Sequence, residues 1–211
     1  MYFKTEGVIL SSRNFSEADK ILNVFTRDYG KMSCIAKGVR RPKSKKVGHA
    51  QSGNWCKIFV AKGKNIDVLT EIEVKRPFGF ENLTLAKIAQ IYHLLELVDF
   101  LTEQNQKNSQ AFYLLINFLE KINQNSNFQL LLAVFKVKLL NSLGFFSNQY
   151  LKNSKNREFF KIIQEEDFKD IEAKINLSNQ NYLKLLVFLD SIVENLAQRK
   201  LKTSRFAYGQ I

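Results

Sequence analysis

The spacing of apolar residues divides the chain into two parts with different periods. Over the first 76 residues, apolar and polar side chains alternate in short runs, which is the period of half-buried strands. Five short strands in about 75 residues predict a small closed or partly closed barrel, and five is the strand count of the OB-fold. An SH3-like barrel fits the periodicity almost as well. The runs cover residues 8–13, 20–27, 31–36, 55–61 and 66–74.

Turn-forming residues separate these runs. Asp28-Tyr29-Gly30 lies between the second and third, and it predicts a short hairpin loop in which Gly30 adopts a positive φ. A second turn is expected at Lys62-Gly63-Lys64-Asn65.

From residue 83 onward, apolar residues recur every three or four positions, which is the period of a helix. These stripes are too apolar for isolated helices and predict a shared bundle. Ser178 is a suitable N-cap for the last helix, and Gly144 can end the third. The stripes cover residues 85–101, 112–122, 131–143 and 183–196.

The fold class that follows is α+β, with two domains. An OB-fold barrel is expected over residues 1–78 and an all-α helical domain over residues 79–211. Residues 145–177 are rich in Asn and Lys and show no clear period, so we expect them to be irregular.

Positive charge is concentrated in the predicted barrel. The chain has a net charge of +12, and residues 1–76 carry nine of those charges. Six of the ten residues from 37 to 46, Lys-Gly-Val-Arg-Arg-Pro-Lys-Ser-Lys-Lys, are basic and none is acidic. Gly38 and Pro42 exclude a regular helix or a central strand, so this basic loop (residues 37–46) is expected to be flexible.

Such a cluster favours a polyanionic partner, because each Lys or Arg that neutralises a phosphate releases a condensed counterion. The plainer interpretation is charge that only keeps the protein in solution. The predicted DNA-binding residues lie in the loop and on the barrel face: Lys37, Arg40, Arg41, Lys43, Lys45 and Lys46, with Arg13, Lys31, Lys57, Lys62 and Lys64.

Aromatic residues could add base stacking to these phosphate contacts. The candidates are Phe15, Tyr29 and Trp55, each of which suits a place in the barrel core equally well. His49 follows the loop and could add a weak DNA contact.

No residue pattern predicts catalysis or a cofactor. The chain has no P-loop motif, and its two histidines, His49 and His93, are isolated. Cys34 and Cys56 are too few for a zinc site of the usual kind, and we expect both in the core of a protein in a reducing cytosol. The acidic run 165–167 could hold Mg²⁺, although a solvated loop is the expected state.

Localisation follows from two absences in the sequence. No uncharged apolar run approaches 18 residues, and the N-terminus has no apolar signal core. We therefore expect a cytoplasmic protein.

The longest specific motif lies in the predicted barrel. Residues 17–31 read Glu-Ala-Asp-Lys-Ile-Leu-Asn-Val-Phe-Thr-Arg-Asp-Tyr-Gly-Lys, and residues 34–44 continue Cys-Ile-Ala-Lys-Gly-Val-Arg-Arg-Pro-Lys-Ser. This block resembles the N-terminal signature of the bacterial RecO family of recombination mediators. Residues 135–145 and 201–205 are similar to two later elements of that family.

The resemblance implies an OB-fold followed by a helical domain, without enzymatic activity or nucleotide hydrolysis. It implies a nucleoid-associated protein that binds single- and double-stranded DNA, anneals complementary strands and works with RecR to load RecA. It also implies binding of the acidic tail of single-strand-binding protein. For that tail we expect a pocket at Phe135, Lys136, Lys138 and Leu139.

The sequence departs from the family pattern in three respects. Residues 147–155 lack the four-cysteine zinc element of some members, so no metal is predicted. Val134 and Lys136 replace the Arg and Glu that flank the family's Phe, which weakens the assignment of the tail pocket. The chain is also somewhat short.

Three other functions remain open from the sequence. The barrel could be a generic OB-fold module for RNA or single-stranded DNA without mediator activity. Residues 165–167 could serve a nuclease. The chain could also be a structural adaptor with an incidental basic loop.

Overall fold

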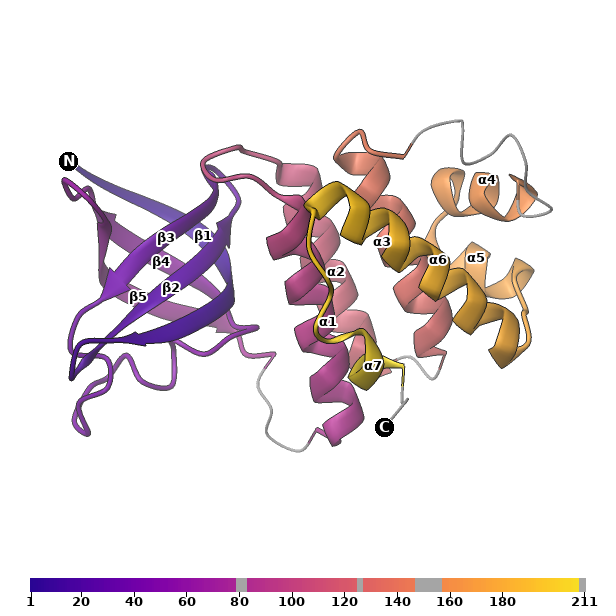
Figure 1. Cartoon of the computed structure of the whole chain (residues 1–211). Coiled ribbons are helices and arrows are strands. Elements are labelled where there is room, and N and C mark those ends of the chain that lie inside the picture. The colour runs from indigo at the N-terminus through magenta and orange to yellow at the C-terminus, as the bar shows by residue number, and fades with distance from the viewer. Residues whose placement is uncertain (79–82, 125–126, 147–156, 209–211) are drawn as a thin grey trace. The chain divides into compact units, whose positions relative to one another are not determined.

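The computed structural model describes residues 1–78, 83–124, 127–146 and 157–208 (Figure 1). The chain forms two compact units. One consists of Met1–Thr84 and Thr102–Ile116, and the other of Leu85–Leu101 and Asn117–Ile211.

The first unit is a closed five-stranded barrel, as the apolar alternation predicts. Its strands follow the order β1-β2-β3-β5-β4, with β3 and β5 parallel and the other pairs antiparallel. This barrel is an OB-fold, so the predicted fold class is confirmed. The strands are β1 (Tyr2–Phe15), β2 (Asp19–Thr26), β3 (Gly30–Ala36), β4 (Trp55–Ala61) and β5 (Asp67–Arg76).

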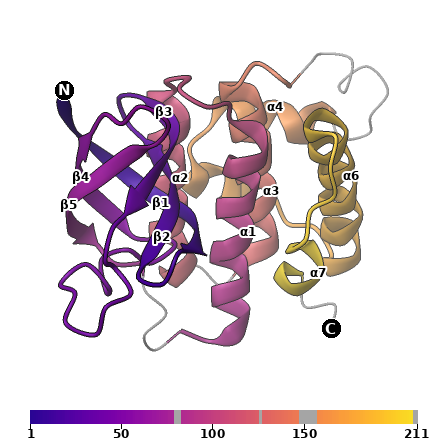
Figure 2. The same ribbon diagram turned by 60° about the vertical axis from the view of Figure 1, so that its left-hand side comes forward.

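The strands differ in how many of their faces are buried. In β2 and β3, side chains on both faces are largely buried, whereas β5 buries mainly one face. The interior is filled by small and medium apolar side chains that include both cysteines. Between β3 and β4 the chain loops out at one end of the barrel (Figures 1 and 2).

The β2–β3 hairpin forms as predicted. Thr26 pairs with Gly30, and the Thr26 hydroxyl donates to the Gly30 carbonyl over 2.7 Å. Gly30 has a φ of 71°, a conformation that a side chain would strain.

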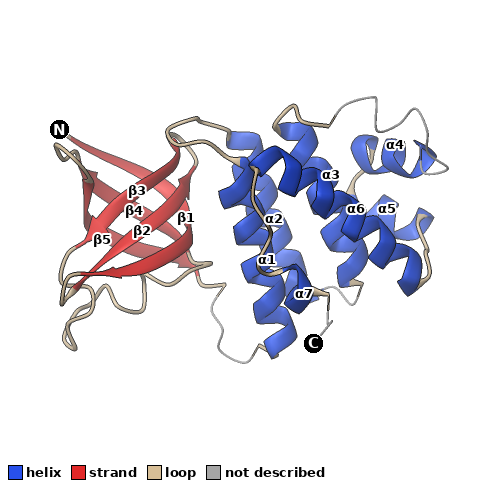
Figure 3. Cartoon of the chain, viewed as in Figure 1, coloured by secondary structure: helices blue, strands red, loops and turns tan. Residues whose placement is uncertain are grey.

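Strands and helices are segregated along the chain (Figure 3). The helices are α1 (Leu85–Leu101), α2 (Ser109–Gln124), α3 (Phe128–Ser142), α4 (Arg157–Glu165), α5 (Phe168–Lys174), α6 (Asn179–Ala197) and α7 (Ser204–Ala207). Ten residues of α3 are buried, so it is the central helix of the second unit. The predicted caps are confirmed: the Ser178 hydroxyl accepts from the amide of Asn181, and Gly144 has a φ of 76°.

Helix α2 contributes to both units. Its residues 109–116 pack with the barrel, where the rings of Phe25 and Phe112 lie 6.2 Å apart and the Ser109 hydroxyl donates to the carbonyl of Arg27. The predicted division at residue 78 assigns all of α2 to the helical domain, which differs from this arrangement.

The prediction that residues 145–177 are irregular is wrong for two segments. α4 buries Phe160 and Ile163, and α5 buries Phe168 and Ile171. Each helix is only about two turns long and buries one apolar pair at a spacing of three, which is shorter than the window in which a helical period can be recognised. Most of the expected zinc-free stretch, residues 147–156, lies outside the described residues.

Among the described residues, no helix is both long enough and apolar enough to cross a lipid bilayer.

Candidate nucleic-acid interface

The basic loop belongs to the connection between β3 and β4, residues 37–54, which folds as a series of turns. Two apolar side chains of this connection, Val39 and Ala50, are 1% exposed and join the barrel core. They fix the connection against the barrel near each of its ends.

Hydrogen bonds hold the same connection in place. The amide of Arg40 donates to the carbonyl of Ala18 over 2.9 Å, and the amide of Gly38 donates to Asp19 Oδ1 over 2.7 Å. At the other end, His49 Nδ1 accepts from the amide of Val74 over 3.3 Å. The loop is therefore anchored rather than a loose connection, and His49 serves as an anchor instead of the expected DNA contact.

The basic side chains of the loop remain at the surface. Five of them are exposed: Lys37, Arg40, Arg41, Lys43 and Lys45. Lys46 differs, because it is half-buried and its Nζ donates to the carbonyl of Leu69 over 3.2 Å. The anchored backbone thus presents five cations to solvent, while the sixth ties the loop to β5.

The predicted extension over the barrel face is only partly exposed. Arg13, Lys57, Lys62 and Lys64 lie at the surface. Lys31 is 7% exposed, and its carbonyl accepts from the amide of Asn105. The assignment of Lys31 to the DNA path is therefore wrong, because the segment after α1 covers that strand.

The three candidate stacking residues have different surroundings. Lys75 lies over the Trp55 ring, with Nζ 4.3 Å from the ring centre, and also pairs with Glu6. One face of the Trp55 ring is thus already occupied. Phe15 and Tyr29 are 47% and 42% exposed and keep surface available for a base.

The predicted tail pocket is not present at its expected residues. Phe135, Lys136 and Leu139 are fully buried, and Lys138 is half-buried with its Nζ donating to the carbonyl of Glu166 over 2.7 Å. The prediction is wrong because α3 packs against α1, α4, α5 and α6, so its apolar side chains form core.

Lys136 takes part in a buried polar cluster. Its Nζ donates to Asp190 Oδ1 and, over 2.5 Å, to the hydroxyl of Tyr208, which in turn donates to Asp190 Oδ2. Burial lowers the pKa of Lys136 to about 8, although the attraction of Asp190 opposes that shift. The cluster joins α3, α6 and the residue after α7.

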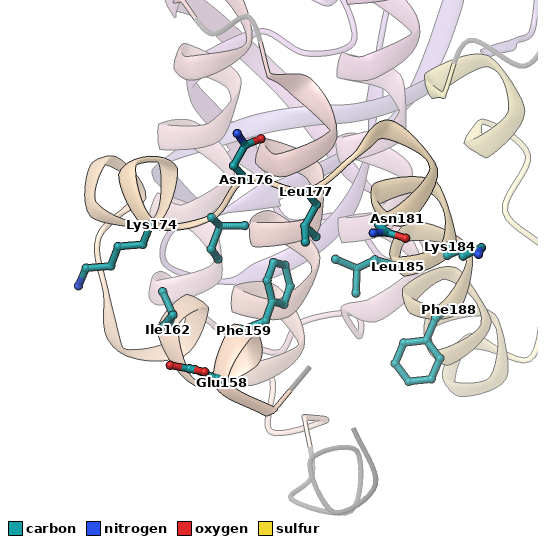
Figure 4. Close-up of a pocket in the computed structure, with 11 residues that line it drawn as sticks. Glu158, Phe159, Ile162, Lys174, Asn176, Leu177, Asn181, Lys184, Leu185 and Phe188 are labelled. Atoms are coloured by element: carbon teal, nitrogen blue, oxygen red, sulfur yellow. The ribbon is translucent and has the colours of Figure 1, made fainter. Parts of the chain in front are cut away.

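A hollow in the helical unit lies between α4, α6 and the segment that joins α5 to α6 (Figure 4). Its volume is about 650 Å³. Phe159, Leu177 and Leu185 point toward one another across it, and Lys174 and Lys184 lie at opposite margins. Lys174 also pairs with Glu166 over 2.5 Å. The hollow thus has apolar side chains in its interior, and its polar margin carries two lysines together with Glu158.

A metal site is not assembled in the described part of the chain. That part contains no cluster of three His, Cys, Asp or Glu residues that could hold a metal ion. Glu166 of the acidic run is engaged by Lys174, and Asp167 precedes the first turn of α5. Burial raises the pKa of both Cys34 and Cys56 to about 12, which makes these thiols poor nucleophiles.

Comparison with known proteins agrees with this architecture. Residues 1–78 match the family model for the N-terminal part of recombination protein O, and residues 82–149 match the model for its C-terminal part. These ranges contain the OB-fold and helices α1 to α3.

Curated relatives named DNA repair protein RecO match the same region. The protein of Alkaliphilus metalliredigens is 32% identical over 145 residues, and that of Pelodictyon phaeoclathratiforme is 33% identical over 148 residues. Each match covers 68–69% of this chain but only 57–59% of the relative's own length. The barrel, the order of the two family segments and these relatives together show that the chain belongs to the RecO family.

Proposed function

We propose that this chain is a DNA-binding mediator of recombinational repair in the cytoplasm. It binds single- and double-stranded DNA without reading sequence and anneals complementary strands on DNA coated with single-strand-binding protein. With RecR, it promotes loading of RecA. The observation that carries the proposal is the anchored basic loop, which presents five exposed cations on an OB-fold.

This arrangement suits contacts with a phosphate backbone. Lys and Arg side chains on an anchored loop can follow phosphates without contacting base edges. Five phosphate contacts would lower affinity for a duplex about 500-fold between about 50 and 200 mM salt. A protein that depends on such contacts can hold a single strand and a duplex in turn.

Strand annealing tests the proposal. We expect the chain to accelerate annealing of complementary oligonucleotides coated with single-strand-binding protein, and to support RecA loading when RecR is added. Replacing Lys37, Arg41, Lys43 and Lys45 by Ala should abolish most of the acceleration, because four of the five exposed loop cations are removed.

A charge-matched control separates the loop from net charge. Lys161, Lys169, Lys202 and Arg205 are exposed in the helical unit, and their replacement by Ala removes the same four charges. This control should anneal as the parent does. If RNA competes as well as DNA and annealing is not accelerated, the chain is a generic nucleic-acid-binding module instead.

The partner tail is proposed to bind at the hollow between α4 and α6, in place of the buried residues of α3. An acidic peptide that ends in an aromatic residue needs an apolar depression with cations at its margin. Lys184 and Phe188, which line the hollow on α6, meet both needs.

A fluorescence-polarisation titration with that peptide tests this placement. Lys184→Glu combined with Phe188→Ser should weaken binding at least tenfold, whereas Lys169→Glu, on α5 outside the hollow, should leave it unchanged. Equal binding by both variants would show that the peptide does not bind in this hollow.

A further inference from the structure

A second hollow lies in the barrel unit, beside the β2–β3 hairpin. Its volume is about 290 Å³, and Phe3, Asp28, Tyr29, Met32, Lys62 and Lys107 line it. Pockets for drug-sized ligands begin near about 300 Å³, so this hollow suits one small planar group rather than a folded peptide.

Tyr29 supplies an aromatic surface in this hollow. Its side chain is 42% exposed, and its ring lies against the ring of Phe3 with the centres 4.5 Å apart. Lys62 Nζ lies 5.5 Å from the centre of the Phe3 ring, and Met32 is 4% exposed. An apolar floor, an exposed ring and flanking cations therefore meet at one point.

A hydrogen bond and close packing hold the hairpin that carries Tyr29. The Tyr29 amide donates to the Thr26 hydroxyl over 3.1 Å. Gly30 packs so closely that a Cβ there would lie 2.1 Å from the carbonyl oxygen of Gln106. A ring on a fixed backbone loses little conformational freedom when a ligand stacks on it.

The one carboxylate of the hollow is already engaged. Asp28 accepts from Arg27 Nε over 3.1 Å and from the Thr5 hydroxyl over 2.7 Å. Arg27 balances the charge of Asp28, and Lys62 itself pairs with Asp67, its Nζ donating to Asp67 Oδ2 over 3.0 Å. Lys107, which is exposed, therefore supplies the positive charge that the hollow presents to a ligand. That charge suits an anion next to the planar group.

Strand β3 relates this hollow to the basic loop. Tyr29 directly precedes β3 and Lys37 directly follows it. Seven residues at about 3.3 Å each place the two at opposite ends of the barrel, roughly 20 Å apart. Sites of about 4–16 nucleotides are usual for one OB-fold, which is long enough for a strand to reach both.

We propose that the hollow holds one unstacked nucleobase of a single strand, with Tyr29 stacking on the base and Lys107 contacting the adjoining phosphate. This inference rests on the proposed DNA-binding function. A duplex keeps its bases stacked, so the hollow adds affinity for single strands alone. It thereby distinguishes the single strand from the duplex, which the basic loop does not.

Fluorescence anisotropy with a labelled 30-nucleotide strand and the corresponding duplex tests the inference. Tyr29→Ala should weaken binding of the strand about tenfold, the effect usual for losing one stacking aromatic, and change duplex binding less than twofold. Tyr29→Phe keeps a ring and should bind both as the parent does. Lys107→Glu, an exposed substitution, should also weaken the single strand more than the duplex.

Control variants distinguish a failure of this inference from a failure of the proposed function. Tyr92→Ala removes a tyrosine of similar exposure, 40%, from the helical unit and should change neither affinity. If Tyr29→Ala retains the parent circular dichroism spectrum and affects both DNAs equally or neither, the hollow is not a base site. Full DNA affinity in the loop variant would instead overturn the proposed function itself.

Discussion

At the scale of single residues, surroundings decide what a charged side chain does. Lys136 and Lys46 were both predicted as binding residues, because a sequence shows charge but not enclosure. Lys136 is fully buried and paired with Asp190, and Lys46 is bonded to the carbonyl of Leu69. A basic residue flanked on both sides by apolar residues in a helix, as Lys136 is in α3, is the sequence signal of a buried ion pair.

The buried pair gives a stability prediction. Asp190→Ala should lower the free energy of unfolding by about 3–5 kcal/mol, because it leaves the charge of Lys136 buried without its carboxylate. The double variant Lys136→Met, Asp190→Leu should lose much less, since no buried charge remains. Urea unfolding measures both, and an equal loss in the two variants would contradict the role of the pair.

The two buried thiols predict a pH dependence. The pKa of each thiol is about 12 in the folded chain and about 9 when exposed. The contribution of the thiols to the free energy of unfolding is therefore fully present below pH 9. It is lost as pH rises toward 12, because the unfolded chain ionises first. Each thiol should contribute about 1.4 kcal/mol of loss per pH unit in that window.

Urea unfolding between pH 8 and 11 measures this loss. The double variant Cys34→Ala, Cys56→Ala should lose stability less steeply than the parent. Lys136 titrates in both proteins, so its effect cancels in the comparison. Parallel curves would show that the thiols are not protected in the folded chain.

At the scale of elements, the period of apolar residues predicted the strands and helices that are long enough to show one. All five strands and the four long helices follow stripes that are visible in the sequence, because each buries a regular face. The sequence did not predict α4 and α5, because a segment of about two turns is too short for a helical period to be recognised. The anchoring of the basic loop was also missed, since it depends on only two apolar residues, Val39 and Ala50, among many polar ones.

A substitution in the β2–β3 hairpin tests why Gly30 is required there. Gly30→Ala should cost more than about 2 kcal/mol in unfolding free energy, because it strains a φ of 71° and places a Cβ against the Gln106 carbonyl. Gly48→Ala is the matched control, since no atom lies within 4 Å of its added Cβ. Thermal or urea unfolding measures both, and similar stabilities would contradict the close packing.

At the scale of the whole molecule, the distribution of charge and the family match both favour the barrel as the proposed DNA-binding part. The net charge of residues 1–76, the motif at residues 17–44 and the family match over residues 1–78 all concern the same domain. The sequence therefore predicted the OB-fold, and it places the proposed interface on that domain. It could not predict which cations remain exposed, because that depends on which segments cover them, as residues 102–107 cover Lys31.

The salt dependence of DNA binding tests the central claim most directly. The slope of log affinity against log salt for a single strand reports the number of phosphates contacted, at about 0.7 per contact. The loop variant lacking Lys37, Arg41, Lys43 and Lys45 should lower that slope by about 3, while the charge-matched variant of the helical unit keeps it. An unchanged slope in the loop variant would contradict the assignment of the basic loop as the DNA interface.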